Sequence, residues 1–148
     1  MLRLAGPGDV ATLAEWMREF YAEQGYPFDP ARHAEAIRGL VADPTLGRLW
    51  WIEDAGARAG YVALCFGWSL EYQGRDAFVD DLYLRPAFRG RGLGARVMQA
   101  VEREARALGV QALHLEVERG NEPARALYEK RGLRDTGRQL LSKRLTGA

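Results

Sequence analysis

Three glycines alternate with other residues in the stretch RGRGLG, and an arginine precedes each of the first two. Gly90, Gly92 and Gly94 carry no side chain, so a ligand can come close to the main chain at these positions. Arg89 and Arg91 supply planar, permanently charged groups that favour phosphate and carboxylate partners. Residue types in this pattern are suited to binding an anion. The stretch therefore predicts a phosphate-binding loop.

The residues on either side indicate what positions this loop. The preceding segment DAFVDDLYL has the composition of a strand, and an apolar stripe at helical spacing follows the glycines. The first turn of a helix carries unpaired N–H groups and the positive end of the helix dipole, and both attract anions. Gly109 is placed to end the helix. The stripe consists of Leu93, Val97, Val101, Ala105 and Leu108.

Two other interpretations of the glycines are weighed here. The glycines could merely provide turns with positive φ. Gly90, Gly92 and Ala95 also satisfy a relaxed dinucleotide fingerprint, which would indicate an oxidoreductase fragment. That fingerprint needs the strand to abut the first glycine, whereas the segment RPAFR intervenes here. A nucleotide P-loop is excluded because no Gly-Lys-Ser/Thr follows.

Composition limits the remaining possibilities. The chain has 148 residues, 47% of them hydrophobic and 28% charged, which predicts a single domain over residues 1–148. Its 21 basic and 20 acidic residues leave no global positive field for nucleic acid. No apolar run approaches the about 20 residues of a membrane span, and no signal peptide is evident. The lone Cys65 lies in an apolar run, so we expect an inert thiol and a cytoplasmic protein.

The order of periodic segments predicts the fold class. Strands are expected at residues 1–5, 47–54, 59–71, 76–84, 112–118 and 138–145. Helices are expected from Asp9 to Gly25, from Pro30 to Asp43, from Gly92 to Gly109 and over 121–132. This order predicts an α+β fold: a mixed, mostly antiparallel, twisted sheet of about six to seven strands with helices on both faces.

Two segments resemble a known family. The stretch DDLYLRPAFRGRGLG is similar to the acetyl-CoA signature of the GNAT-type N-acetyltransferase superfamily, which Arg89, Gly92 and Gly94 match. The stretch NEPARALYEKRGL resembles the second signature of that family. It is matched by Asn121, Ala124, Leu127, Tyr128 and Gly132. Leu133 departs from the pattern, because the family usually has phenylalanine after the glycine.

The resemblance implies a GNAT-like fold and transfer of an acetyl group from acetyl-CoA directly to a primary amine. In such proteins two strands splay apart and the pantetheine arm lies between them, bound to the backbone of the first strand. The residues that the resemblance assigns to acetyl-CoA are Leu82, Tyr83, Leu84, Arg89, Gly90, Arg91, Gly92, Leu93, Gly94, Ala95, Asn121 and Tyr128.

Acetyl transfer to an alkylamine needs two proton transfers. The amine is protonated at neutral pH and must lose a proton, and the thiolate leaves more readily if an acid protonates it. The family uses the position of Tyr128 as that acid, although a core aromatic is the alternative. Candidate bases are Asp80, Asp81 and Glu116.

The three candidate bases are not equivalent. Strand alternation sends Asp80 and Asp81 to opposite faces unless a bulge intervenes. Asp80 lies nine positions before Arg89, where diamine acetyltransferases of the superfamily carry a catalytic glutamate. The shorter aspartate suggests action through a water molecule. A purely local cap or salt bridge of Asp80 remains the alternative.

The acceptor is expected near two acidic and aromatic stretches, FYAEQGYPFD and GWSLEYQGRD. Candidate substrate-binding residues are Tyr26, Trp68, Glu71 and Tyr72, which would attract a cation through charge and aromatic faces. We expect a small-molecule amine such as a polyamine. A peptide or protein amine, or a non-catalytic acetyl-CoA-binding module, remains open, as does a homodimer. His33 and His114 show no metal-ligand spacing and predict no metal site.

Overall fold

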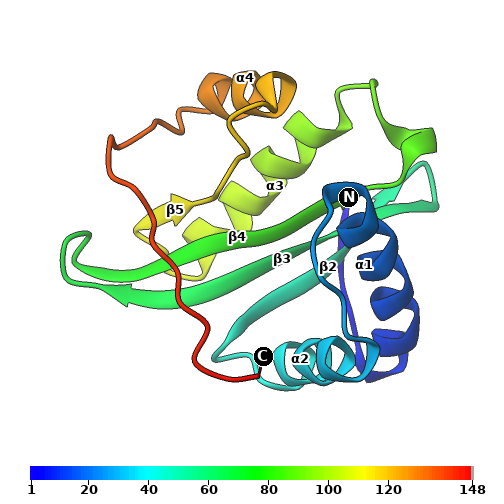
Figure 1. The fold of residues 1–148 in the computed structure, drawn as a ribbon. Coiled ribbons are helices and arrows are strands. Elements are labelled where there is room, and N and C mark those ends of the chain that lie inside the picture. The colour runs from blue at the N-terminus through cyan, green and yellow to red at the C-terminus, as the bar shows by residue number, and fades with distance from the viewer. Residues whose placement is uncertain (148) are drawn as a thin grey trace.

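The fold is organised around one twisted sheet. The computed structural model describes residues 1–147. The strands lie side by side in chain order, and only the last pair, β4 and β5, is parallel (Figure 1). Their bounds are β1 Leu2–Leu4, β2 Gly47–Asp54, β3 Ala57–Ser69, β4 Gly74–Leu84 and β5 Ala112–His114. The predicted α+β class with a mixed, mostly antiparallel sheet is confirmed.

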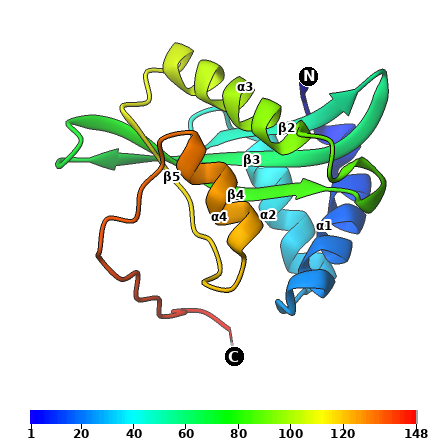
Figure 2. The same cartoon turned by 90° about the horizontal axis from the view of Figure 1, so that it is seen from above.

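Two helices cover each face of the sheet, as Figures 1 and 2 show. On one face lie α1 (Val10–Gln24) and α2 (Pro30–Ala42), and on the other lie α3 (Leu93–Ala107) and α4 (Glu122–Lys130). Because side chains alternate along a strand, neighbouring residues of β2 enter different cores. Trp50 packs on the α3 side and Trp51 on the α1 side. No helix within residues 1–147 combines the length and the apolar character that crossing a membrane requires.

The helix boundaries follow from their capping residues. Asp29 accepts a hydrogen bond from the backbone N–H of Arg32 at 3.1 Å, and Pro30 occupies the first helical position of α2. Gly25 ends α1 in the left-handed conformation, with φ of 72°. Both predicted helices are therefore confirmed.

The predicted strand count of six to seven is wrong, because the described chain has five strands. Residues 138–145 form no strand, and Leu140, Leu141 and Leu145 in this segment are exposed. The physical reason is the short edge next to them: β5 ends at His114, so it offers only three residues for further pairing. Instead, Arg138 forms an ion pair with Glu71 of the β3–β4 connection at 2.9 Å.

Candidate active site

The predicted phosphate-binding loop lies between β4 and α3. Gly90 and Gly92 both have left-handed backbones, with φ of 76° and 73°, and Gly92 is the N-cap residue of α3. A Cβ built on either residue would meet no other atom within 4 Å. The glycines are thus required by the backbone conformation, and the space beside them is open.

The backbone amides of this loop are available to a ligand. Within the described chain, no N–H group of residues 90–95 has a hydrogen-bond acceptor. The first amide that is paired belongs to Arg96, which donates to the carbonyl of Gly92 at 3.4 Å. These free donors lie at the positive end of the helix dipole of α3, which is the arrangement that binds phosphate groups. The loop therefore fits the pyrophosphate of acetyl-CoA.

Gly94 has a different reason to be glycine. A Cβ at this position would lie 3.2 Å from Cδ1 of Leu127 in α4. That separation is tighter than ordinary van der Waals contact, so a larger residue would push α4 away from α3. The third glycine of the motif therefore serves helix packing, whereas Gly90 and Gly92 shape the loop.

The side chains of Arg89 and Arg91 are already bonded to other groups of the protein. Arg89 donates from Nε to the carbonyl of Leu84 at 2.8 Å and pairs with Glu23 at 2.7 Å. Arg91 donates to the carbonyl of Ala87 at 2.8 Å. The backbone N–H of Arg89 is also paired, with the carbonyl of Pro86 at 3.2 Å. Of these two residues, only Arg91 therefore offers a free backbone amide to the cofactor.

The strands on either side of the site diverge. β4 pairs with β5 only from Asp76 to Phe78, and β4 then continues to Leu84 without a strand on that side. The carbonyl of Tyr83 points toward β3, so along this open edge the backbone groups of Leu82 and Leu84 face the opening. The resemblance puts the pantetheine arm in this place. The side chain of Tyr83 is buried on the α1 face, and its hydroxyl donates to Glu19 at 3.3 Å.

A β-bulge decides where the two aspartates of β4 point. Val79 pairs with Leu64 and Asp81 pairs with Ala63, so Asp80 is the additional residue in β4. Regular alternation from Val79 would put Asp81 on the α3 face. The bulge turns Asp81 to the α1 face, where it is 8% exposed, and leaves Asp80 exposed.

Two tyrosine hydroxyls hold the buried carboxyl group of Asp81. Tyr61 of β3 donates to Oδ2 at 2.9 Å, and Tyr21 of α1 lies 3.2 Å from both oxygens. Burial raises the pKa of Asp81 to about 7 from an ordinary 3.8, the hydrogen bond from Tyr61 opposes this, and the negative charge of Asp80 adds to it. Burial also raises the pKa of both tyrosines, which therefore remain protonated donors.

Because the pKa of Asp81 is raised, the free energy of unfolding should depend on pH. Because the folded state holds this proton more tightly than the unfolded state, Asp81 lowers the free energy of unfolding as pH rises from 3.8 to about 7. We expect Asp81→Asn, which cannot ionise, to gain stability relative to the wild type between pH 5 and pH 8. Urea unfolding of both proteins at the two pH values measures this difference. An equal difference at both values would contradict the assignment.

The proposed acid, Tyr128, lies half-buried on α4, against the core on the α3 side of the sheet. Burial raises the pKa of its hydroxyl, and within the described chain this hydroxyl has no hydrogen-bond partner. It is therefore protonated and free to donate. Asn121 caps the same helix, since its Oδ1 accepts from the N–H of Ala124 at 3.3 Å, which leaves its NH₂ group for a ligand.

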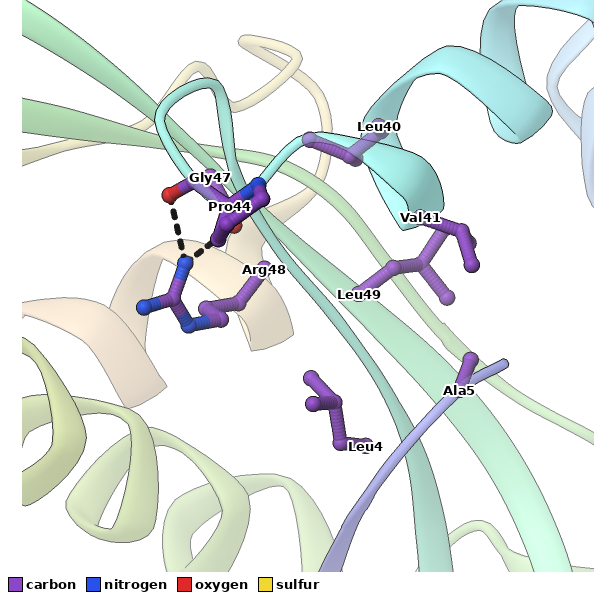
Figure 3. A pocket seen from close by; sticks show the side chains of 8 residues that line it. All are labelled: Leu4, Ala5, Leu40, Val41, Pro44, Gly47, Arg48 and Leu49. Atoms are coloured by element: carbon purple, nitrogen blue, oxygen red, sulfur yellow. Dashed lines mark hydrogen bonds between the residues drawn. The ribbon is translucent and has the colours of Figure 1, made fainter. Parts of the chain in front are cut away.

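A cavity of 1600 Å³ lies between β5, α4 and the C-terminal segment. Tyr128, Glu71, Tyr72 and Glu116 line it, so the structure brings the predicted acid together with half of the predicted acceptor residues. Asp80, Asp81, Tyr26 and Trp68 do not line it. Trp68 is 77% exposed near the end of β3. A second pocket, of 150 Å³ between β1, β2 and α2, contains none of the predicted site residues (Figure 3).

Sequence reasoning missed three partners. Tyr61 was not identified, because only the bulged register brings it to Asp81. The hydroxyl of Tyr26 donates to Glu118 at 2.8 Å, which joins the α1–α2 connection to the segment after β5. His114, for which the sequence predicted no metal site and no other role, lies 3.0 Å from Asp76 and lines the large cavity. The sequence did predict strands that contain Asp76 and His114, and pairing of these two strands would have indicated the contact.

Comparison with known proteins identifies the family. A model of the acetyltransferase (GNAT) family matches residues 10–133. The chain belongs to this family. Membership confirms the predicted N-acetyltransferase family, and proteins of this family use acetyl-CoA as the acetyl donor. A thialysine N-epsilon-acetyltransferase of Sus scrofa is 33% identical over 91% of this chain and 84% of its own length. The chain spans about half the length of several other curated relatives that it matches.

Solved structures share the GNAT fold over nearly the whole chain. An integron cassette protein from the mobile metagenome of Cole Harbour Salt Marsh is 37% identical, with a TM-score of 0.86 over 99% of this chain and 91% of its own. A predicted acetyltransferase of Clostridium acetobutylicum, solved with acetyl-CoA, is 19% identical. Its TM-score is 0.80 over 97% of this chain and 95% of its own. This GNAT chain therefore has the predicted GNAT-like architecture.

Proposed function

We propose that this GNAT chain is an N-acetyltransferase that transfers the acetyl group of acetyl-CoA directly to a primary amine. The observation that carries the proposal is the row of free backbone amides at residues 90–95, at the N-terminus of α3. Acetyl-CoA supplies the activated acetyl group when bound, with its pyrophosphate on these amides. Release of free thiol from acetyl-CoA in the presence of an amine tests the function. Binding of acetyl-CoA without thiol release would instead indicate the non-catalytic module.

Asp81 is the proposed proton acceptor. An alkylammonium must lose a proton before its nitrogen can attack the thioester carbon, and a base is most effective when its pKa lies near the working pH. The pKa of Asp81, raised to about 7, meets this requirement. Asp81 does not line the cavity that Tyr128 lines, so the proton would reach its carboxylate through water rather than by direct contact. Asp80, exposed beside it, contributes negative charge.

Tyr128 is the proposed proton donor. As the new C–N bond forms and the C–S bond breaks, the phenolic proton of Tyr128 passes to the departing sulfur. The protein offers no thiolate for a covalent route, because burial and the negative charges of Asp80 and Asp81 raise the pKa of Cys65 to about 11. Transfer directly from acetyl-CoA to the amine is therefore favoured.

The proposed acceptor is a small cationic amine. Glu71, Asp76 and Glu116 line the same cavity as Tyr128, and Tyr72 adds an aromatic face, which suits an ammonium group. The relative from Sus scrofa is named for acetylation of thialysine, a small amine. Glu71 pairs with Arg138 at the rim of the cavity, and a cationic acceptor would compete for this carboxylate. An amine of a peptide or protein is the second candidate.

Screening acceptors tests this assignment. We expect polyamines or other small amines to release thiol from acetyl-CoA faster than short peptides or acidic amines. Glu71→Gln should raise KM for the cationic acceptor several-fold, since an exposed ion pair contributes about 0.2–1 kcal/mol. Glu104→Gln, which removes an exposed carboxylate of α3 outside the cavity, should leave KM unchanged. Activity with peptides alone, together with an unchanged KM in Glu71→Gln, would show that the acceptor site is misplaced.

A further inference from the structure

Asp81 is the one buried charged residue of the described chain, and its surroundings are built by three separate elements. The bulge of β4 turns it toward α1, and β3 supplies Tyr61, whose side chain is fully buried. Tyr21 comes from the last part of α1. Two hydroxyls converging on one carboxyl group satisfy both of its oxygens, which a buried carboxylate requires.

Neither tyrosine needs to be there for packing alone. Phe20, next to Tyr21, packs against Tyr61 and Tyr83 in the same cluster without any polar atom. A phenylalanine at either tyrosine position would keep the same ring and would leave Asp81 with one donor fewer. The hydroxyls therefore serve the carboxyl group.

We infer that Tyr61 and Tyr21 are positioning residues, which fix the carboxylate of Asp81 in the orientation and ionisation state that acetyl transfer needs. This inference rests on the proposed function, in which Asp81 accepts the proton of the amine. It adds that two hydroxyl donors, Tyr61 of β3 and Tyr21 of α1, set the proton affinity of Asp81. The packing of α1 on the sheet would therefore affect catalysis.

Opposing effects act on Asp81, and the tyrosines are the ones that favour the carboxylate. Burial disfavours the charged form most strongly, the hydrogen bond from Tyr61 comes next and favours it, Asp80 disfavours it, and Tyr21 favours it. The other titratable groups near this cluster are Tyr26 beside Tyr21, Cys65 on β3 and His33 of α2, whose ring lies 5.5 Å from that of Tyr21.

The test is a pair of pH titrations on the full chain and on Tyr61→Phe and Tyr21→Phe. In the first, the midpoint of the Asp81 carboxyl is followed by ¹³C NMR with labelled aspartate, assigned by its loss in Asp81→Asn. In the second, kcat for thiol release is measured against pH with one amine that the wild type acetylates. The acceptor's own titration is the same in every variant and cancels in the comparison.

We expect both midpoints to move upward together, because each variant loses a hydrogen bond to the charged form. Tyr61→Phe should shift them by about one pH unit, and Tyr21→Phe by less. At pH values above the shifted midpoint, kcat should recover to within a few-fold of the wild type. Trp16→Phe, a buried aromatic change in the same core cluster but without contact to Asp81, should leave both midpoints in place.

Distinct outcomes separate failure of this inference from failure of the proposed function. Suppose that the wild type is active and that the midpoint of the kcat–pH profile is the same in Tyr61→Phe and Tyr21→Phe as in the wild type. The positioning role is then wrong, while acetyl transfer stands. If the NMR midpoint of the Asp81 carboxyl moves but the midpoint of the kcat–pH profile does not, the inference is also overturned, since Asp81 would then not be the proton acceptor. If the wild type releases no thiol with any amine, the proposed function itself fails. Should Tyr61→Phe not fold, Tyr21→Phe decides alone.

Discussion

Gly92→Val is expected to abolish acetyl-CoA binding, with at least about a 100-fold loss of affinity. A valine here places a branched side chain beside the free amides of residues 90–95, in space that is open in the structure. Three or more charge-assisted hydrogen bonds would be blocked, and each is worth about 1.5–3 kcal/mol. Calorimetric titration with acetyl-CoA measures the effect.

A matched control separates lost binding from backbone strain. Gly109 ends α3, also has a left-handed backbone with φ of 78°, and also has open space around it. Gly109→Val therefore introduces similar strain at the other end of the same helix, of about 1–2 kcal/mol. We expect it to lower the melting temperature about as much as Gly92→Val and to bind acetyl-CoA normally. Equal affinities in the two variants would refute the pyrophosphate site.

Tyr128→Phe is expected to lower kcat about 100-fold or more, which is the usual contribution of one general acid. The hydroxyl has no partner within the described chain, so its removal should cost little stability. It acts on the departing sulfur in the transition state, so affinity for acetyl-CoA should change little. Steady-state kinetics of thiol release and calorimetry on the same preparation provide both numbers.

The changes in kcat and in acetyl-CoA affinity also distinguish the other possible roles of Tyr128. If Tyr128 is only a core aromatic, kcat in Tyr128→Phe should remain within about twofold of the wild type. If the ring instead helps to hold the cofactor, acetyl-CoA affinity should fall together with kcat. Either pattern would exclude the proposed role of its hydroxyl as the acid.

Much of the fold was predictable because its signals are local. Asp29 and Pro30 begin α2, Gly25 ends α1, and the apolar stripe after Gly92 gives α3, all through contacts within a few residues. The closing strand was not predictable in this way. Whether residues 138–145 form a strand depends on the partner edge, and the apolar pattern carries no information about the length of β5.

In the candidate site, too, some features follow from local sequence and others depend on the tertiary structure. The sequence alone determined the glycine loop and the helix that follows it, and predicted phosphate binding there, since the glycines, the helix start and the free amides all lie within one continuous stretch of chain. It also limited the base to a few carboxylates. Only the tertiary structure distinguishes the two aspartates, because a one-residue bulge in β4 turns Asp81 to the α1 face and leaves Asp80 exposed, and a bulge is a property of strand pairing. The raised pKa of Asp81 likewise depends on burial and on hydroxyls from α1 and β3, which are distant in sequence and meet only when the helices close over the sheet.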